Sequence, residues 1–331
     1  MPPQGLPLIY GGLAAGAAII SYYFFWPDAP RGAPTYTNAL LSPTHFIPAT
    51  LTESKLCADS DFRLMTLAVP SQCIQSLEQT TFAPIWSIYV KDDDIQVERP
   101  YTPLTGIDEE GKMRLWIKRY AKGEVGRWLH SKQVGDKIEI RGPVKTWIWK
   151  DETWDEVVMI SGGTGVTPFY QLLHAMMLKN PAQASKTKFT LLHSSPNPIE
   201  LPPPDMLEPL LLAAQKHSDR LKVGLFVDSL DGPEHPLVSS SNLHLGRIEK
   251  TAVEQAVYGE PKTQSWWPFF FRSDSKRASD KDVDRKILFL VCGPEPMISS
   301  IAGPYGKNFS QGTVGGVLGS LGFRRDQVWK L

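Results

Sequence analysis

The chain has 331 residues, with 35 basic and 35 acidic side chains, so its formal net charge is zero. Hydrophobic residues make up 42% of the sequence, a globular composition, and the length suggests two domains with a ligand-binding cleft between them. A chain without net charge has no overall field to attract nucleic acid, so we expect no nucleic-acid partner.

The N-terminal segment from residue 6 to residue 26 carries no charge and ends in the aromatic run Tyr22–Trp26. Its 21 residues are long enough to span a bilayer, and aromatic rings favour the membrane interface. No basic segment precedes the run and no small-residue cleavage site follows it, so we predict a transmembrane anchor rather than a signal peptide. Residues 27–48 contain five prolines and are predicted to form a linker.

Residues 49–150 contain short alternating or apolar segments separated by proline, glycine and aspartate. The segments are 61–69, 86–90, 113–120 and 137–141. Several short strands at this spacing predict an antiparallel β-barrel. Within this region Arg99 and Tyr101 lie two residues apart on one strand, where they would face the same side. A cation and a flat ring together suit the pyrophosphate and the ring system of a flavin dinucleotide. By itself the pair is more often an ordinary surface pair on one strand face.

A second candidate for phosphate binding follows at Gly123, Glu124, Val125, Gly126 and Arg127, which are expected to open a helix after a strand. Free amides at a helix N-terminus bind phosphate, and glycine lets the backbone approach closely. By itself this segment is equally typical of an ordinary turn and helix.

Residues 151–331 change to a pattern of buried strands alternating with helices. Expected strands are 157–160, 189–192, 221–227 and 287–291, and expected helices are 169–178 and 205–216. This order predicts a parallel doubly wound α/β domain with insertions near 228–246 and 260–285. The second insertion holds the aromatic run 266–271, which is either a loop packed on the domain or a patch that contacts a membrane or partner.

A glycine-rich turn follows the first of these strands at Gly162, Gly163, Thr164 and Gly165, and Thr167 and Pro168 come next. A turn between a buried strand and a helix is the usual context for a dinucleotide pyrophosphate. Cys292 ends another buried strand and precedes Gly293 and Pro294, which places its sulfur at the ligand-binding edge of the sheet. The three cysteines, Cys57, Cys73 and Cys292, are too widely spaced for a disulfide framework or zinc site, and we predict no metal.

Three blocks, RPYTPL at 99–104, GGTGVTP at 162–168 and CGPEPM at 292–297, occur in the order typical of one family. The chain resembles the FAD-containing NAD(P)H reductases of the ferredoxin-NADP reductase superfamily, and among them the NADH-cytochrome b5 reductases. The resemblance implies an enzyme with an antiparallel FAD-binding barrel, a nicotinamide-binding α/β domain, and a haem protein as electron acceptor.

Carried over by residue, the resemblance implies that Arg99 and Pro100 meet the FAD pyrophosphate and that Tyr101 and Thr102 lie at the flavin ring. It assigns Lys118 and Tyr120 to the second flavin strand and 123–127 to the phosphate turn. It further implies that 162–165, Thr167 and Pro168 hold the nicotinamide dinucleotide beside Cys292, Gly293, Pro294 and Met297. Thr102, Thr167 and Cys292 would be the residues nearest the chemistry.

Some features depart from this family. Gly126 replaces a usual serine or threonine, Glu124 replaces a small or basic residue, and the chain ends in Val328–Leu331, so that Trp329 is expected to cover the flavin. The 123–130 block, the insertions, the linker and the anchor are closer to a fungal mitochondrial cytochrome c import factor. That branch implies a single-pass protein of the mitochondrial inner membrane that reduces haem iron or binds a cytochrome c or haem lyase partner with weak turnover.

Two further choices remain open in the sequence. The outer mitochondrial membrane or the endoplasmic reticulum is the alternative location. A cytochrome b5-type haem protein is the expected acceptor, and the cytochrome c import system is the alternative partner. Residues 193–200 contain no lysine or arginine to bind a 2'-phosphate, which favours NADH over NADPH, although Ser194 and Ser195 leave NADPH open.

Overall fold

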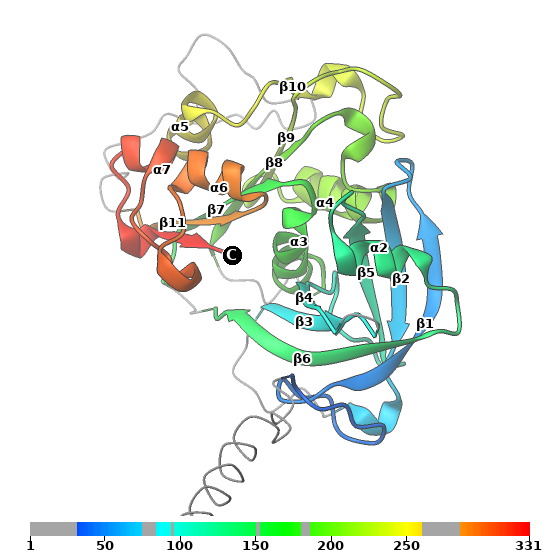
Figure 1. Cartoon of the computed structure of the whole chain (residues 1–331). Helices are drawn as coiled ribbons and strands as arrows, with labels where there is room; N and C mark the ends of the chain where they lie inside the picture. The colour runs from blue at the N-terminus through cyan, green and yellow to red at the C-terminus, as the bar shows by residue number, and fades with distance from the viewer. Residues whose placement is uncertain (1–31, 75–83, 94–95, 150–152, 180–185, 260–284) are drawn as a thin grey trace, which may run out of the picture. The chain divides into compact units, whose positions relative to one another are not determined.

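The fold is described from a computed structural model of the chain (Figure 1). The structure describes residues 32–74, 84–93, 96–149, 153–179, 186–259 and 285–331, and residues 35–331 form one compact unit. The predicted anchor at 6–26, the aromatic run at 266–271 and the insertion up to residue 284 lie outside these ranges. No helix within the described ranges is long and apolar enough to cross a membrane.

The first lobe is a six-stranded antiparallel sheet in the order β4-β3-β6-β1-β2-β5. Its elements are β1 Ile47–Leu56, β2 Phe62–Ala68, β3 Ile85–Lys91, β4 Glu98–Tyr101, β5 Lys112–Lys118, α2 Glu124–Ser131 and β6 Lys137–Trp147. The amide of Leu104, just after β4, donates to the carbonyl of Arg114 in β5 at 2.9 Å, so the two outer strands approach each other. The predicted antiparallel architecture is confirmed.

The apolar core of this lobe collects the inward-facing residues of the strands, among them Leu51, Met65 and Ile117, and α2 adds Val125 and Leu129. Alternation along each strand explains this, because successive side chains point to opposite faces. Burying these side chains contributes about 1.5–3 kcal/mol each relative to leaving them in water.

The segment predicted as a linker up to residue 48 differs from expectation at its C-terminal part. Phe46 and Ile47 are fully buried, Thr35 forms a bridge with Phe46, and β1 begins at Ile47. The prolines of this stretch do not prevent burial, because moving the adjacent apolar side chains of Phe46 and Ile47 from water into the core is favourable. Residues 35–48 therefore belong to the first lobe.

The second lobe is a six-stranded parallel sheet in the order β10-β9-β8-β7-β11-β12. Its strands are β7 Glu156–Gly162, β8 Lys188–Ser195, β9 Leu221–Val227, β10 His244–Leu245, β11 Ile287–Cys292 and β12 Val328–Lys330. Its helices are α3 Thr167–Leu173, α4 Pro204–Lys216, α5 Lys250–Tyr258, α6 Glu295–Ala302 and α7 Gly316–Ser320. The predicted parallel α/β architecture is confirmed.

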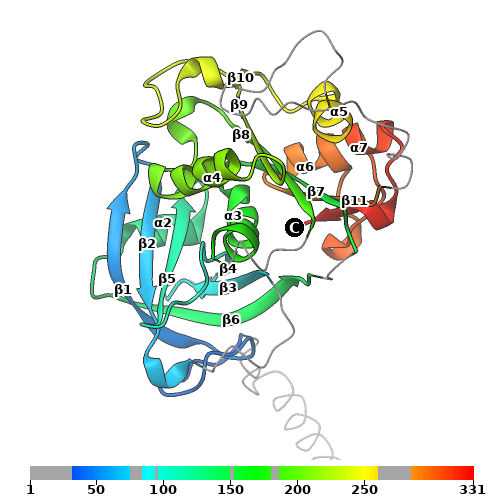
Figure 2. The same ribbon diagram turned by 180° about the vertical axis from the view of Figure 1, so that it is seen from behind.

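Helices cover both faces of this sheet (Figure 2). Val157 and Met159 of β7 pack in the cluster that includes α3 and α4, whereas Val158 and Ile160 pack with α5, α6 and α7. A strand buried on both faces needs an uninterrupted apolar sequence, which is why residues 157–160 lack the polar alternation of an antiparallel strand.

The predicted insertion at 228–246 supplies more than a surface loop. Its end forms β10, the outermost strand, which pairs in parallel with β9. His235 within it is buried, and its Nε2 lies 3.1 Å from the Pro202 carbonyl while its Nδ1 accepts from the Leu237 amide at 3.2 Å. The sequence does not predict β10, because this strand has only two residues and lies in a polar segment.

Candidate active site

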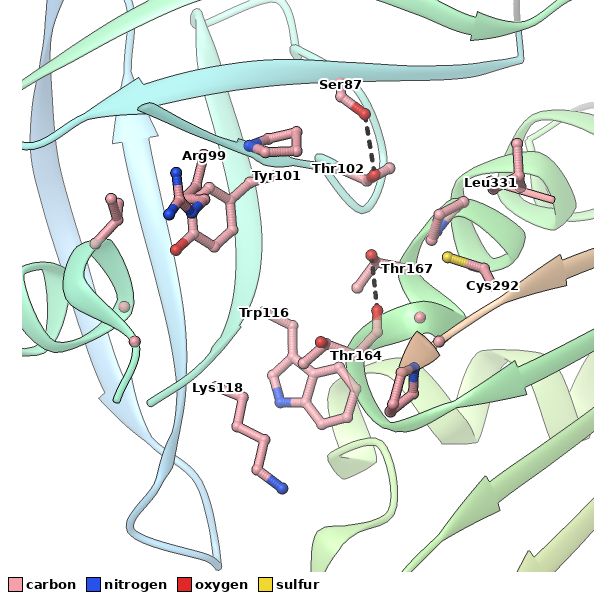
Figure 3. Close-up of a pocket in the computed structure, with 18 of the residues that line it drawn as sticks. Ser87, Arg99, Tyr101, Thr102, Trp116, Lys118, Thr164, Thr167, Cys292 and Leu331 are labelled. Carbon is pink, nitrogen blue, oxygen red and sulfur yellow. Dashed lines mark hydrogen bonds between the residues drawn. The ribbon is translucent and has the colours of Figure 1, made fainter. Parts of the chain in front are cut away.

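A cavity of about 900 Å³ lies between the two sheets and is lined by residues of both lobes (Figure 3). β3, β4, β5, β6 and the start of α2 form one wall, and the ends of β7 and β11 with the start of α3 form the other. The C-terminal edge of a parallel sheet is where ligands of open α/β folds bind. The volume lies within the range of cofactor sites, about 300–1,000 Å³.

Most of the residues predicted from sequence line this cavity. They are Arg99, Pro100, Tyr101, Thr102, Lys118, Tyr120, Gly123, Glu124, Val125, Gly126, Gly162, Thr164, Gly165, Thr167, Pro168, Cys292, Gly293 and Pro294. Three blocks that are far apart in the sequence are thus brought to one space.

Arg127, Gly163 and Met297 were predicted at the site but do not line the cavity. Arg127 is exposed on α2, one position beyond the residues that face the cavity. Gly163 has a φ of 52°, a backbone conformation that favours glycine. It shapes the turn but does not line the cavity. Met297 lies behind the wall, where its sulfur would be 2.5 Å from a Cβ added at Gly162.

The cavity also contains residues that the sequence reasoning missed, namely Ser87, Tyr89, Trp116, Lys122, Val144, Lys145, Thr146 and Leu331. Trp116 lies two residues before Lys118 on β5, so strand alternation would have placed both on one face. Residues of β3 and β6 carried no comparable signal, because their position depends on sheet order.

The C-terminal strand corrects one expectation. Trp329 was expected to cover the flavin, but it is 40% exposed and does not line the cavity, whereas Leu331 does. Alternation in β12 places Val328 and Lys330 on the buried face and leaves Trp329 exposed, and Leu331 lies beyond the end of the strand.

Arg99 provides an accessible positive charge on the wall formed by the first lobe. One guanidinium nitrogen donates to the carbonyl of Glu98 at 2.8 Å, while the Glu98 carboxylate is paired with Arg141 at 2.7 Å. Among the described residues no carboxylate forms an ion pair with Arg99. Its charge is therefore available to an anion, and Arg binds phosphate oxygens through paired N–H groups.

Tyr101 lies beside Arg99 on the same wall (Figure 3). Burial raises the pKa of its phenol to about 12, so the ring is neutral throughout the physiological range. A neutral, half-buried aromatic ring provides a flat surface for a stacked cofactor ring.

Gly126 is explained by its close approach to β5. A Cβ added there would lie 2.9 Å from the carbonyl oxygen of Lys118, closer than real Cβ contacts permit. The glycine lets the first turn of α2, whose N-cap is Gly123, lie directly against β5. The missing hydroxyl at this position is thus a packing requirement of this chain.

The wall formed by the second lobe depends on contact between the glycine turn and β11. A Cβ added at Gly165 would lie 2.4 Å from the carbonyl oxygen of Cys292 and 2.7 Å from the Cα of Gly293. The turn over Gly163–Val166 therefore rests on the end of β11, beside the cysteine. Thr167 follows it and donates its hydroxyl to the Thr164 carbonyl at 3.0 Å.

Cys292 and Thr102 lie on opposite walls of the cavity (Figure 3). Burial raises the pKa of the Cys292 thiol to about 12, which keeps it neutral at physiological pH. The Thr102 hydroxyl lies 3.3 Å from that of Ser87, which in turn lies 3.2 Å from that of Thr146. These groups can position a ligand by contact and hydrogen bonding, but the thiol is not a thiolate nucleophile.

The residues present fit an FAD and a nicotinamide dinucleotide. Arg99 supplies a cation that has no carboxylate partner among the described residues, and Tyr101 supplies a ring. The glycine turn lines the cavity with Gly162, Thr164 and Gly165. The described residues contain no cluster of three or more histidine, cysteine, aspartate or glutamate side chains that would hold a metal ion.

Sequence families describe the two lobes separately. Residues 49–149 match the oxidoreductase FAD-binding domain, and residues 159–302 match the oxidoreductase NAD-binding domain. NADH-cytochrome b5 reductase 2 of Lodderomyces elongisporus is 30% identical over 76% of this chain and 72% of its own length. NADH-cytochrome b5 reductase 2-A of Vanderwaltozyma polyspora is 27% identical over 99% of this chain and 97% of its own length.

Solved structures share the fold. The cytochrome b5 reductase domain of Ulva prolifera nitrate reductase superposes with a TM-score of 0.61 at 21% identity, covering 88% of this chain and all of that domain. The human Ncb5or CS-b5R domains in the NAD+ form give a TM-score of 0.57 at 19% identity, covering 86% of this chain and 69% of that chain.

Proposed function

The chain belongs to the NADH-cytochrome b5 reductase family of FAD- and NAD-dependent oxidoreductases, and we propose that it passes electrons from NADH through FAD to a haem protein. The observation that carries the proposal is the single cavity joining the wall at 99–102 to the glycine turn and Cys292. When bound, FAD would supply the electron-transfer chemistry: it would take the two electrons and hydrogen of a hydride from NADH and pass the electrons singly to two haem irons, with release of a proton.

On the flavin side, we assign Arg99 to neutralise the pyrophosphate of FAD and Tyr101 to lie against its ring. The backbone amides from Glu124 to Gly126 in the first turn of α2 add donors to the same phosphates, because the first turn of a helix leaves its amides without partners inside the helix. Lys118 and Tyr120 at the end of β5 close this side of the cavity.

On the nicotinamide side, we assign the Gly162–Gly165 turn to the pyrophosphate of NADH. Thr167 and Thr102 face the space between the two walls and orient what is bound there by hydrogen bonds. The neutral Cys292 thiol holds the nicotinamide ring by contact, and Pro168, Gly293 and Pro294 complete the wall.

Replacing Cys292 by serine is expected to slow reduction of the flavin by NADH roughly 10-fold, because a ring displaced by less than an ångström already transfers hydride poorly. FAD content should stay within twofold of the parent, since the flavin wall is untouched. Rapid anaerobic mixing measures the first quantity and absorbance the second. Cys57→Ser, outside the cavity, is the matched control and should change neither; equal losses of FAD and of reduction rate in Cys292→Ser would remove this role.

NADH is proposed as the donor rather than NADPH. From His193 to Glu200, which covers the end of β8 and the residues after it, the chain has no lysine or arginine. A 2'-phosphate bound beside this segment would find no lysine or arginine of the segment to balance its charge.

The apolar segment 6–26 supports a single-pass membrane anchor, and we propose a mitochondrial membrane, with the inner membrane preferred. The acceptor is then a membrane-associated haem protein of the cytochrome b5 type. A second candidate is a flavoprotein that assists cytochrome c import or haem attachment, supported by the 123–130 block and the insertions, with weak turnover.

The acceptor is tested by adding NADH to the FAD-loaded full chain together with the soluble haem domain of cytochrome b5 or with cytochrome c. Fast reduction of cytochrome b5 by catalytic amounts of protein supports the first proposal. Tight binding of apocytochrome c or haem lyase with turnover slower than about once per minute favours the second. A flavin that NADH bleaches but neither haem protein reoxidises contradicts both acceptors.

A further inference from the structure

We propose that Gln171 is a positioning residue that sets the nicotinamide wall of the cavity against the flavin wall. It lies on α3 in the second lobe, is 3% exposed, and does not line the cavity. The inference rests on the proposed function, because the distance between these two walls matters only if hydride crosses between them.

Both polar atoms of the Gln171 side chain bond to backbone groups of the first lobe. Its Oε1 accepts from the amide of Trp86 in β3 at 2.8 Å, and its Nε2 donates to the carbonyl of Pro103 at 2.8 Å. One side chain therefore connects α3 to two separate segments of the opposite lobe. Both bonds are near the ideal N–H···O length.

Each end of this connection adjoins a residue of the cavity. Trp86 precedes Ser87 and Pro103 follows Thr102, and the hydroxyls of Ser87 and Thr102 lie 3.3 Å apart on the flavin wall. On its own helix Gln171 lies four residues after Thr167, so the two are on the same face of α3. Any shift of α3 relative to β3 thus moves Thr167 relative to Thr102.

Other contacts join the lobes but specify their relative position less. The cluster that includes Phe62, Trp116 and Phe169 is apolar, and apolar burial is non-directional. The Lys55–Asp205 pair has 56% and 34% exposed side chains, and exposed pairs contribute little. Lys118 pairs with Glu200 at 2.6 Å, but through a flexible lysine stem.

Gln171 is suited to this role because its side-chain amide is planar and buried. Its two hydrogen bonds therefore form or break together. Losing them leaves the Trp86 amide and the Pro103 carbonyl buried without their partner, a cost that the lobes relieve by moving apart to admit water. A displacement of about 1 Å between reacting groups can cost up to about 100-fold in rate.

Gln171→Met tests the inference, because methionine keeps the size of the side chain and removes both hydrogen bonds. His235→Leu is the matched control: His235 is also buried and also joins one backbone amide and one backbone carbonyl, but both belong to the second lobe. The first readout is hydrogen-deuterium exchange of a peptide containing the Trp86 amide in the FAD-loaded full chain. The second is the rate of flavin reduction by saturating NADH, with FAD content as the reference.

We expect Gln171→Met to exchange the Trp86 amide at least 10-fold faster and to reduce its flavin roughly 10- to 100-fold more slowly, with FAD content within twofold. His235→Leu should leave both quantities within twofold. If the methionine variant does not fold, Gln171→Glu serves, because it keeps the acceptor for Trp86 and removes the donor to Pro103.

A Gln171 variant that reduces its flavin at the parental rate, or a His235→Leu protein slowed equally, overturns the inference. A parental protein whose FAD is not reduced by NADH overturns the proposed function instead. The exchange of the Trp86 amide is read in either case, so the two failures are distinguishable.

Discussion

Arg99→Ala is expected to leave the protein folded but largely without FAD. Removing a charge-assisted, bidentate contact to a phosphate costs about 3 kcal/mol of binding free energy, which raises the dissociation constant roughly 100-fold. The fold should be affected little, because the Arg99 side chain is exposed and, within the described part of the chain, its hydrogen bond is to the carbonyl of Glu98. Titration of the apoprotein with FAD, followed by flavin fluorescence, gives the affinity directly.

Arg119→Ala is the control for this change. Arg119 directly follows β5 and is exposed, but its guanidinium pairs with Asp61 at 2.7 Å and it does not line the cavity. The control removes one positive charge from the same lobe and should keep FAD affinity within about twofold. If the two variants bind FAD equally well, Arg99 is not the pyrophosphate ligand.

The second large effect is expected for Gly165→Ala, which should weaken NADH binding while FAD stays bound. The added Cβ would lie 2.4 Å from the Cys292 carbonyl oxygen, which is a backbone atom that cannot rotate away. The turn and β11 must separate, at a cost of about 1–3 kcal/mol of stability or more. This shift moves the Cys292 wall, so NADH should bind at least 10-fold more weakly.

Gly163→Ala separates this clash from a simple loss of glycine. The φ of Gly163 is 52°, but no atom lies within 4 Å of an added Cβ, so only backbone strain of about 1 kcal/mol is expected. Thermal unfolding and NAD+ titration of the FAD-loaded variants compare the two. A Gly165→Ala protein as stable as Gly163→Ala, with parental NAD+ affinity, would show that the close contact with β11 is not needed.

Much of the site could be predicted because its residues are contiguous in short motifs. Arg99–Thr102, Gly162–Gly165 and Cys292–Pro294 each follow or form a strand, and the end of a strand fixes where the next residues lie. The fold class was accessible for the same reason: the change from alternating to uninterrupted apolar strands distinguishes an antiparallel sheet from a parallel one.

What could not be predicted depends on contacts between distant segments. Ser87 and Thr146 reach the cavity only through the order of β3 and β6 in the sheet, which the sequence does not state. Trp329 was misplaced because three residues are too few to reveal the alternation of β12. Gln171 resembles any polar residue of a helix until its two backbone partners, at positions 86 and 103, are seen.

The most direct test of the central claim is anaerobic mixing of the FAD-loaded protein with NADH, and separately with NADPH, while flavin absorbance is followed. We predict that NADH bleaches the flavin within seconds, because we propose that one cavity holds both cofactors. NADPH should do so at least 10-fold more slowly, because residues 193–200 offer no lysine or arginine to its 2'-phosphate. A tightly bound flavin that neither nucleotide bleaches would contradict a hydride path through this cavity.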